Sequence, residues 1–356
     1  MGRVLTTLAF LLGHWTLSNP ASAFSYEVLF DETLARDAIL YGRGQVLVTG
    51  FKSVLLDGQV KTDGTDATTY DRLLVSSVRV LHQVPLSGNL ALRGTLPVVL
   101  TYEKTEGDKI PRIITEATWF ESKPKVELIY ATQNNLDLVF GLNVYAISKY
   151  KVNTESENFT ASDTYSPVTS NFGHLALVKH AGTFDGGFAF QFKAEKTRKL
   201  TKQTSLETDA RTFEDRVYQP TTIAIFANTR RSFGDLYGEF AAVEASGGGN
   251  VSEVGRYVRE DYFRFQLAGL FPLNGKSLGL ESSLLYKSLS YADNRAVTLD
   301  TIPMAALHLK LHVDYGLPFF VGLIGVRGTD GQSLQEFNAQ YKLFGVGGTA
   351  GLNLML

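Results

Sequence analysis

The chain has 356 residues, a formal net charge of −2 at neutral pH and no cysteine. The balanced charge argues against nucleic acid as a partner, because binding phosphates usually needs a basic excess or a basic patch. Without cysteine there are no disulfide bonds and no thiolate chemistry, so backbone pairing and apolar burial must stabilise the fold. No Pro/Ser-rich linker divides the chain, and all-β barrels of this length are commonly a single domain.

The first 23 residues have the layout of a secretory signal peptide. Arg3 gives a positive start, the run VLTTLAFLLGHWTL is apolar, and SNPASA supplies small residues for cleavage after Ala23. This run is shorter than the about 20 apolar residues of a membrane-spanning helix, and no later run reaches about 18. We therefore predict that residues 1–23 are cleaved and that the mature protein is built beyond the inner membrane.

Residues 24–43 come before the first strand pattern. Within them, Asp31 to Gly42 has a capping acid, an acidic first turn and a terminal glycine, which predict a short helix. Two placements stay open for residues 24–43: a periplasmic segment or a plug in the interior of the following domain. We favour the periplasmic placement.

The remaining chain, residues 44–356, alternates apolar and polar residues with a period of two, which is typical of strands with two unlike faces. Phe263 and Phe265, for example, flank Arg264. Further on, Asn274-Gly275 predicts a tight hairpin turn. The same alternation recurs over residues 90–103, 136–144, 188–195, 278–287 and 307–314.

Short and long connections alternate along this region. The short ones are residues 85–89, 133–137, 183–187, 231–235, 272–276 and 315–318, and seven longer polar stretches, such as 153–167, lie between them. This pattern predicts an all-β, antiparallel, up-and-down sheet of fourteen strands, with twelve or sixteen as alternatives and both termini at the short-turn end. The strands near 44–57, 166–181 and 319–328 are the least defined. Pro97 cannot donate a ladder hydrogen bond and predicts an edge or a bulge.

A soluble β-sandwich also has one apolar and one polar face, so alternation alone does not decide the class. The strand arms often have ten or more residues, which suits the about 9–11 needed to cross a bilayer at a tilt. Tyr102, Tyr150, Tyr286 and Tyr315 lie near the ends of apolar stripes, where an aromatic girdle would lie. We predict a closed transmembrane barrel with apolar residues outside and a watery interior; a secreted soluble β protein is the alternative.

The mature chain resembles Gram-negative outer-membrane β-barrels over its whole length. Its last strand, VGGTAGLNLML, has Ala350, Leu352, Leu354 and Leu356 in step, although such proteins usually end on an aromatic residue. The strand number is similar to that of the long-chain fatty-acid channel family and of monomeric porins. The segment GNLALRGTLPVVLTYEK is similar to a hairpin of outer-membrane proteins associated with meta-pathway phenol degradation. The resemblance implies an outer-membrane location, contact with its lipid and lipopolysaccharide, and recognition of the last strand by the barrel-assembly machinery.

Enzyme, cofactor and metal signals are weak. Asn274 to Ser277 imitates the end of a phosphate loop, but no helix follows, and no Ser/His/Asp set can be assembled. His308 and His312 on one strand would lie about 13 Å apart, too far to share a metal ion. They could make permeation depend on pH, although ordinary polar lining is the favoured interpretation. We expect no enzymatic activity, no cofactor and no metal.

Charged and polar residues of the alternating segments are predicted to line the lumen: Arg79, Arg93, Lys149, Lys193, Glu239, Arg264, Glu281, Lys287, His308, Lys310, His312 and Asp314. Their mixed signs favour a hydrated channel for passive diffusion of small hydrophilic solutes or ions. Two alternatives stay open. One is a transporter of hydrophobic or aromatic small molecules with an N-terminal plug, and the other is a structural or surface-interaction barrel that acts through its loops.

Overall fold

The structure is a computed structural model of the whole chain. It describes residues 43–62, 68–107, 113–122, 124–143, 146–156, 159–170, 172–193, 198–204, 214–215, 219–246, 257–273, 276–291, 300–314, 318–333 and 339–355. The predicted signal peptide, the predicted helix before Arg43 and the Asn274-Gly275 turn lie outside these residues. No described helix is long and apolar enough to cross a membrane.

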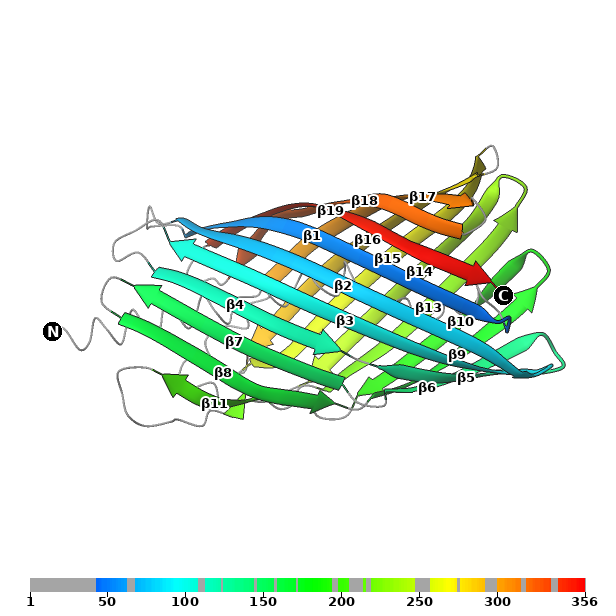
Figure 1. Ribbon diagram of the computed structural model, residues 1–356, viewed down its shortest axis with the longest axis horizontal. Coiled ribbons are helices and arrows are strands. Elements are labelled where there is room, and N and C mark those ends of the chain that lie inside the picture. The colour runs from blue at the N-terminus through cyan, green and yellow to red at the C-terminus, as the bar shows by residue number, and fades with distance from the viewer. Residues whose placement is uncertain are drawn as a thin grey trace.

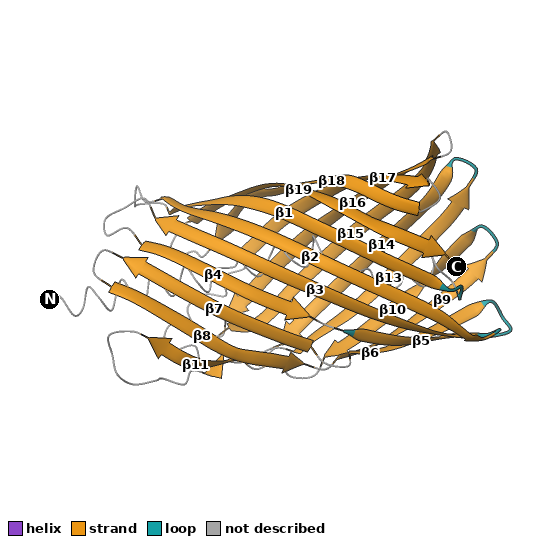
Figure 2. Ribbon diagram, in the orientation of Figure 1, coloured by secondary structure: helices purple, strands orange, loops and turns teal. Residues whose placement is uncertain are grey.

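The described residues are almost entirely β-strand (Figure 2). The strands are β1 (Val46–Thr62), β2 (Thr68–Ser87), β3 (Leu90–Gly107), β4 (Ile113–Ser122), β5 (Lys125–Ala131), β6 (Leu136–Asn143), β7 (Ala146–Ser156), β8 (Phe159–Ser170), β9 (Phe172–Ala181), β10 (Phe184–Lys193), β11 (Arg198–Thr204), β12 (Glu214–Asp215), β13 (Gln219–Arg231), β14 (Gly234–Ser246), β15 (Tyr257–Leu273), β16 (Lys276–Tyr291), β17 (Asp300–Asp314), β18 (Pro318–Ser333) and β19 (Ala339–Met355).

These strands form one antiparallel sheet whose positions follow the order of the chain. Strand β1 pairs with β2 on one side and with β19 on the other, from Val46↔Met355 to Thr62↔Ala339, so the sheet closes on itself. At five positions of the wall, two consecutive elements lie end to end and together act as one strand. These are β4/β5, β6/β7, β8/β9, β10/β11 and β12/β13. The nineteen described elements therefore occupy fourteen positions, as the alternation of connections predicts.

The described short turns lie at one end of the barrel, on the right in Figure 1, where β1 begins and β19 ends. The first strand therefore begins, and the last strand ends, at the short-turn end, as the alternation of connections predicts. In the turn between β5 and β6, Asn135 has a positive φ of 53°. The pairing of Leu273 with Lys276 leaves two residues between β15 and β16, the length that an Asn-Gly turn favours.

The opposite end differs from the prediction, because several strands are longer than expected. Strand β2 has 20 residues, which is about 66 Å at 3.3 Å per residue and well beyond the about 9–11 residues that cross a bilayer. Residues 153–167 were predicted as a long loop, yet β7 continues to Ser156 and β8 begins at Phe159. Ladder pairing satisfies the backbone whatever the polarity of the side chains, so polar sequence continues as strand outside the membrane.

Pro97 lies at the point of β3 where the neighbouring strand changes from β5 to β4. Below it Thr95 pairs with Lys125 of β5, and above it Val98 pairs with Ser122 of β4. The hydroxyl of Ser122 donates a hydrogen bond to the Pro97 carbonyl oxygen at 2.9 Å. The proline, which has no N–H to donate, thus lies at an irregularity of the ladder, as predicted.

The two faces of the strands have opposite environments. On one face, large apolar side chains such as Phe265 and Leu323 are exposed. On the other face, which the alternate residues of the strands occupy, side chains such as Arg93 and Glu239 are buried. In a closed barrel the buried face is the inner one, because only the outer face has nothing packed against it. The predicted sidedness, with apolar residues toward lipid and charged residues inside, is confirmed for these strands.

This sidedness predicts that an arginine on the outer face is destabilising in a depth-dependent way. Phe265→Arg, in the middle of β15, should lower the free energy of unfolding by about 2–4 kcal/mol, whereas Phe233→Arg, in the turn between β13 and β14, should lower it by at most about 1 kcal/mol. Reversible urea unfolding in lipid vesicles measures both. Equal effects at the two positions would contradict the assignment of the outer face.

Candidate functional site

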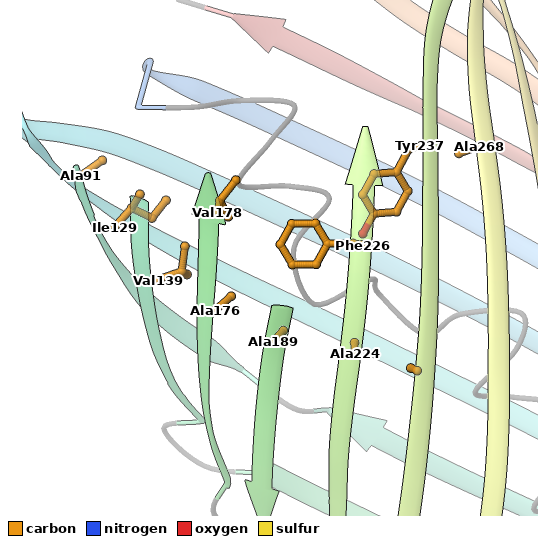
Figure 3. Packing of buried hydrophobic residues seen from close by; sticks show 11 residues of the cluster. Ala91, Ile129, Val139, Ala176, Val178, Ala189, Ala224, Phe226, Tyr237 and Ala268 are labelled. Carbon is orange, nitrogen blue, oxygen red and sulfur yellow. The ribbon is translucent and has the colours of Figure 1, made fainter. Parts of the chain in front are cut away.

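The inner wall near the short-turn end carries a row of small apolar residues. Each belongs to a different strand and is the ladder partner of the next: Ala91, Ile129, Val139, Ala176, Ala189, Ala224 and Ala241. All seven are fully buried, and Figure 3 shows most of them on adjacent strands. We call this set the alanine row. Val178, Phe226 and Tyr237 extend the same apolar cluster toward the turns.

A second apolar area lies at the seam where the barrel closes. On the inner face, Leu56 and Val54 of β1 pair with Leu73 and Val75 of β2 on one side. On the other side they pair with Gly345 and Gly347 of β19, which in turn pair with Val326 and Ile324 of β18. All six apolar side chains are buried. We call them the seam patch, and with the alanine row they form two apolar areas of the described inner wall, beside its buried polar residues.

A buried ionic cluster lies one ladder row above the alanine row. The Arg93 Nε donates to the Glu127 Oε2 at 2.6 Å. The Lys125 Nζ lies 3.2 Å, and the His174 Nε2 2.8 Å, from Glu127 Oε1. One carboxylate therefore contacts three basic side chains: Lys125 on its own strand, Arg93 on β3 and His174 on β9. We call Arg93, Lys125, Glu127 and His174 the Glu127 cluster.

Gly141 makes this cluster possible. It stands between Glu127 of β5 and His174 of β9 in the ladder, so a side chain there would separate the two residues. The imidazole of His174 occupies the space that a Cβ at Gly141 would fill. A missing side chain on β6 thus lets the histidine of β9 reach across to the carboxylate of β5.

A second ionic cluster ties the strands together at the short-turn end. The two ring nitrogens of His180 lie 2.7 Å from Asp185 Oδ1 and 3.1 Å from Asp137 Oδ2. Asn228 donates to Asp185 Oδ2 at 3.2 Å, and an Arg230 Nη lies 2.7 Å from the same oxygen. These five residues, the rim cluster, come from β6, β9, β10 and β13, so their contacts hold four strands at the rim.

Three of the twelve predicted lumen residues have side chains that the structure describes. Arg93 is buried in the Glu127 cluster, and Glu239 is buried and accepts a hydrogen bond of 2.6 Å from the Tyr237 hydroxyl. Arg79 is partly buried. The other nine are described by backbone pairing alone, which puts position 264 opposite Ala241 and position 281 opposite position 308. Their lining roles stay predictions.

Glu127, His174, His180 and Asp185 are functional candidates that were not predicted from the sequence. Glu127 lies between Val126 and Leu128, so its alternation carried a usable signal. The two histidines fall in a segment whose faces are hard to tell apart by sequence. Among the described residues, no group of three His, Cys, Asp or Glu side chains could hold a metal ion.

Solved structures with a similar fold are membrane channels. The Pseudomonas putida toluene transporter TodX matches with a TM-score of 0.59 and 10% identity, over 90% of this chain and 92% of that chain. A Pseudomonas aeruginosa FadL homologue matches with a TM-score of 0.55 and 10% identity, over 88% and 90%. The fold is that of an outer-membrane β-barrel. The Ralstonia pickettii toluene transporter TbuX is a further neighbour, with a TM-score of 0.50 and 10% identity over 88% and 90%.

No protein-family model and no curated protein sequence matches the chain. Identities of about 10% to the structural neighbours show a shared fold and nothing finer. Any role therefore has to be argued from the inner wall of this barrel.

The packing over Gly141 predicts a specific effect of adding one methyl group. Gly141→Ala should displace the His174 ring, break its contact with Glu127 and lower the free energy of unfolding by about 1–3 kcal/mol. Gly325→Ala is the matched control, because a Cβ there meets nothing within 4 Å. Urea unfolding in vesicles should show the loss in the first variant alone. In a protein that already carries His174→Ala, the added Gly141→Ala should have little effect. A full loss of stability in this double variant would mean that the added methyl group clashes with a residue other than His174.

Neutralising Glu127 should destabilise the barrel strongly. Glu127→Gln leaves the guanidinium of Arg93 buried without its carboxylate, and breaking a buried pair in this way costs about 3–5 kcal/mol. Asp57→Asn is the control, since the Asp57–Arg72 pair is exposed and such pairs contribute at most about 1 kcal/mol. Similar losses in the two variants, measured by the same unfolding experiment, would mean that Glu127 is hydrated and not buried.

Proposed function

We propose that the protein is an outer-membrane channel for hydrophobic small molecules, the first alternative of the sequence analysis. The observation that carries the proposal is the apolar inner lining formed by the alanine row and the seam patch. For an apolar molecule, transfer from water to such a surface is favourable in free energy. A hydrated ion, in contrast, finds few polar groups there to replace its hydration shell.

The state of the inner charges supports the same conclusion. In the Glu127 cluster and the rim cluster, basic and acidic groups contact each other directly at 2.6–3.2 Å. Paired charges tie strands together, and pairing weakens the field that each charge produces in the lumen. The structural neighbours add a parallel argument, because two of them are described as toluene transporters.

We propose no enzymatic activity for this barrel. Binding of lipopolysaccharide and recognition of β19 by the assembly machinery belong to the same proposal, as does the cleavage of residues 1–23. A purely structural role through the loops has no supporting contact among the described residues.

The experiment that tests the proposal compares a hydrophobic and a hydrophilic permeant. Cells whose outer membrane carries the protein should accumulate radiolabelled ethylbenzene several times faster than cells with an empty vector. The purified protein in planar bilayers should give little ohmic conductance. Ala176→Arg, which adds a long charged side chain to the alanine row, should slow ethylbenzene entry to the vector level. A large salt-dependent conductance with unchanged ethylbenzene entry would instead support the hydrophilic pore.

A further inference from the structure

The rim cluster contains a histidine that lies between two carboxylates. At the short-turn end of β9, the Nδ1 of His180 lies 2.7 Å from the Asp185 Oδ1, and its Nε2 lies 3.1 Å from the Asp137 Oδ2. Both carboxylates are buried, whereas the His180 side chain keeps 29% of its surface exposed. We call these two contacts the His180 bridge, because they join β6, β9 and β10 at the right-hand end of the barrel in Figure 1.

The two contacts require a particular protonation state of the imidazole ring. An ionised carboxylate only accepts hydrogen bonds, and a neutral imidazole has one N–H donor and one bare nitrogen. Both contacts are therefore hydrogen bonds only when both ring nitrogens of His180 carry a proton, which makes the ring a cation. In a neutral ring, the bare nitrogen would face a carboxylate oxygen at 2.7 Å or 3.1 Å, and two acceptors repel each other.

The charges around the ring favour the cation. Asp137 of β6 and Asp185 of β10 face the two ring nitrogens of His180, and Arg230 of β13 lies 2.7 Å from the other oxygen of Asp185. With a neutral ring, two carboxylates face one guanidinium and the net charge is −1; with an imidazolium it is zero. A buried carboxylate without a cation is highly unfavourable, so a proton on His180 stabilises Asp137. Lys179, next along β9, is exposed and donates to a backbone carbonyl.

Backbone contacts surround the His180 bridge. The N–H of His180 donates to the Asn135 carbonyl oxygen of the β5–β6 turn at 2.9 Å, and Asp185 is the ladder partner of His180 on β10. This end of the barrel, with its short turns, is the one that faces the periplasm in outer-membrane barrels. Loss of the bridge would leave backbone hydrogen bonds alone to hold the end of β9 against β6 and its turn.

We propose that the His180 bridge makes the periplasmic rim of the barrel proton-dependent: acid joins β6, β9 and β10 firmly, and alkali releases β9 from β6. Imidazole gains and loses its proton between about pH 5 and about pH 8. Because only the protonated ring makes both contacts, lowering the pH favours the joined rim. The inference goes beyond the proposed function, since it concerns the periplasmic exit of the channel whatever molecule passes through it.

The first test follows the ring itself. The full-length protein is labelled with ¹⁵N-histidine, placed in lipid nanodiscs and examined by NMR at about pH 5.5 and about pH 8, within the range in which imidazole titrates. Both ring nitrogens of His180 should carry protons at the lower pH, and one should be bare at the higher pH. A bare nitrogen at the lower pH, or a ring that does not change between the two, would overturn the proposal.

The second test follows the rim. Hydrogen exchange of the His180 amide, corrected for the intrinsic effect of pH on exchange, reports how often this N–H leaves the Asn135 carbonyl. Its protection should fall about tenfold between about pH 5.5 and about pH 8, which is the effect of losing one hydrogen bond to a charged group. Equal protection at the two pH values would show that the proton does not hold the rim.

Two variants change the bridge in opposite directions. The side chain in His180→Gln is neutral at every pH, so low protection of the residue 180 amide should persist in acid. The amide in Asp137→Asn can donate to a bare ring nitrogen, so high protection should persist at the higher pH. His82→Gln is the matched control and should keep the wild-type response, because His82 is exposed on β2, opposite Leu47. If a variant does not fold, the two measurements on wild-type protein still decide.

Discussion

The closure of the backbone hydrogen-bond ladder between β1 and β19 is the constraint on which the rest of the structure depends. In a bilayer no water is present to bond free N–H and C=O groups, so a sheet that crosses it must have no open edge. Seventeen residue pairs join the first and last strands over their whole length. Once the wall is closed, each side chain faces either lipid or lumen, and the period of two in the sequence becomes a division into outside and inside.

The inside of the wall has to satisfy a second constraint, which is the neutralisation of buried charge. An isolated ion in the low-dielectric interior is highly unfavourable, so each inner carboxylate of the described clusters contacts a basic group on another strand. Glu127 holds partners on β3, β5 and β9, and Asp185 holds His180 and Arg230. The number of charged residues on the inner face is therefore a poor measure of its hydration. This explains why a count of inner charges favoured a hydrophilic pore, whereas their pairing supports the hydrophobic channel that we propose.

Alternation and turn length are local properties, and they predicted the sidedness, the fourteen positions and the end at which β1 begins and β19 ends. Contacts across the wall are a different matter. Glu127 and His174 are far apart in sequence, and they meet because the turns fix a register that puts Gly141 between them. No pattern in a single strand reports that register. The extension of polar strands such as β7 and β8 past the membrane was missed for a related reason, since ladder pairing there needs no apolar face.

Glycines shape the inner surface, because large side chains of neighbouring strands occupy the space above them. The His174 ring lies over Gly141, the Phe226 ring lies close to Gly187, and Leu56 lies over Gly345. In each case a glycine on one strand accepts a large side chain from its neighbour, so the lumen is contoured by pairs of adjacent strands. Alternation restricts only the polarity of each position, which allows barrels of about 10% identity to share a fold. These glycine pairs are free to differ between such barrels, so lumens of one fold can have different contours.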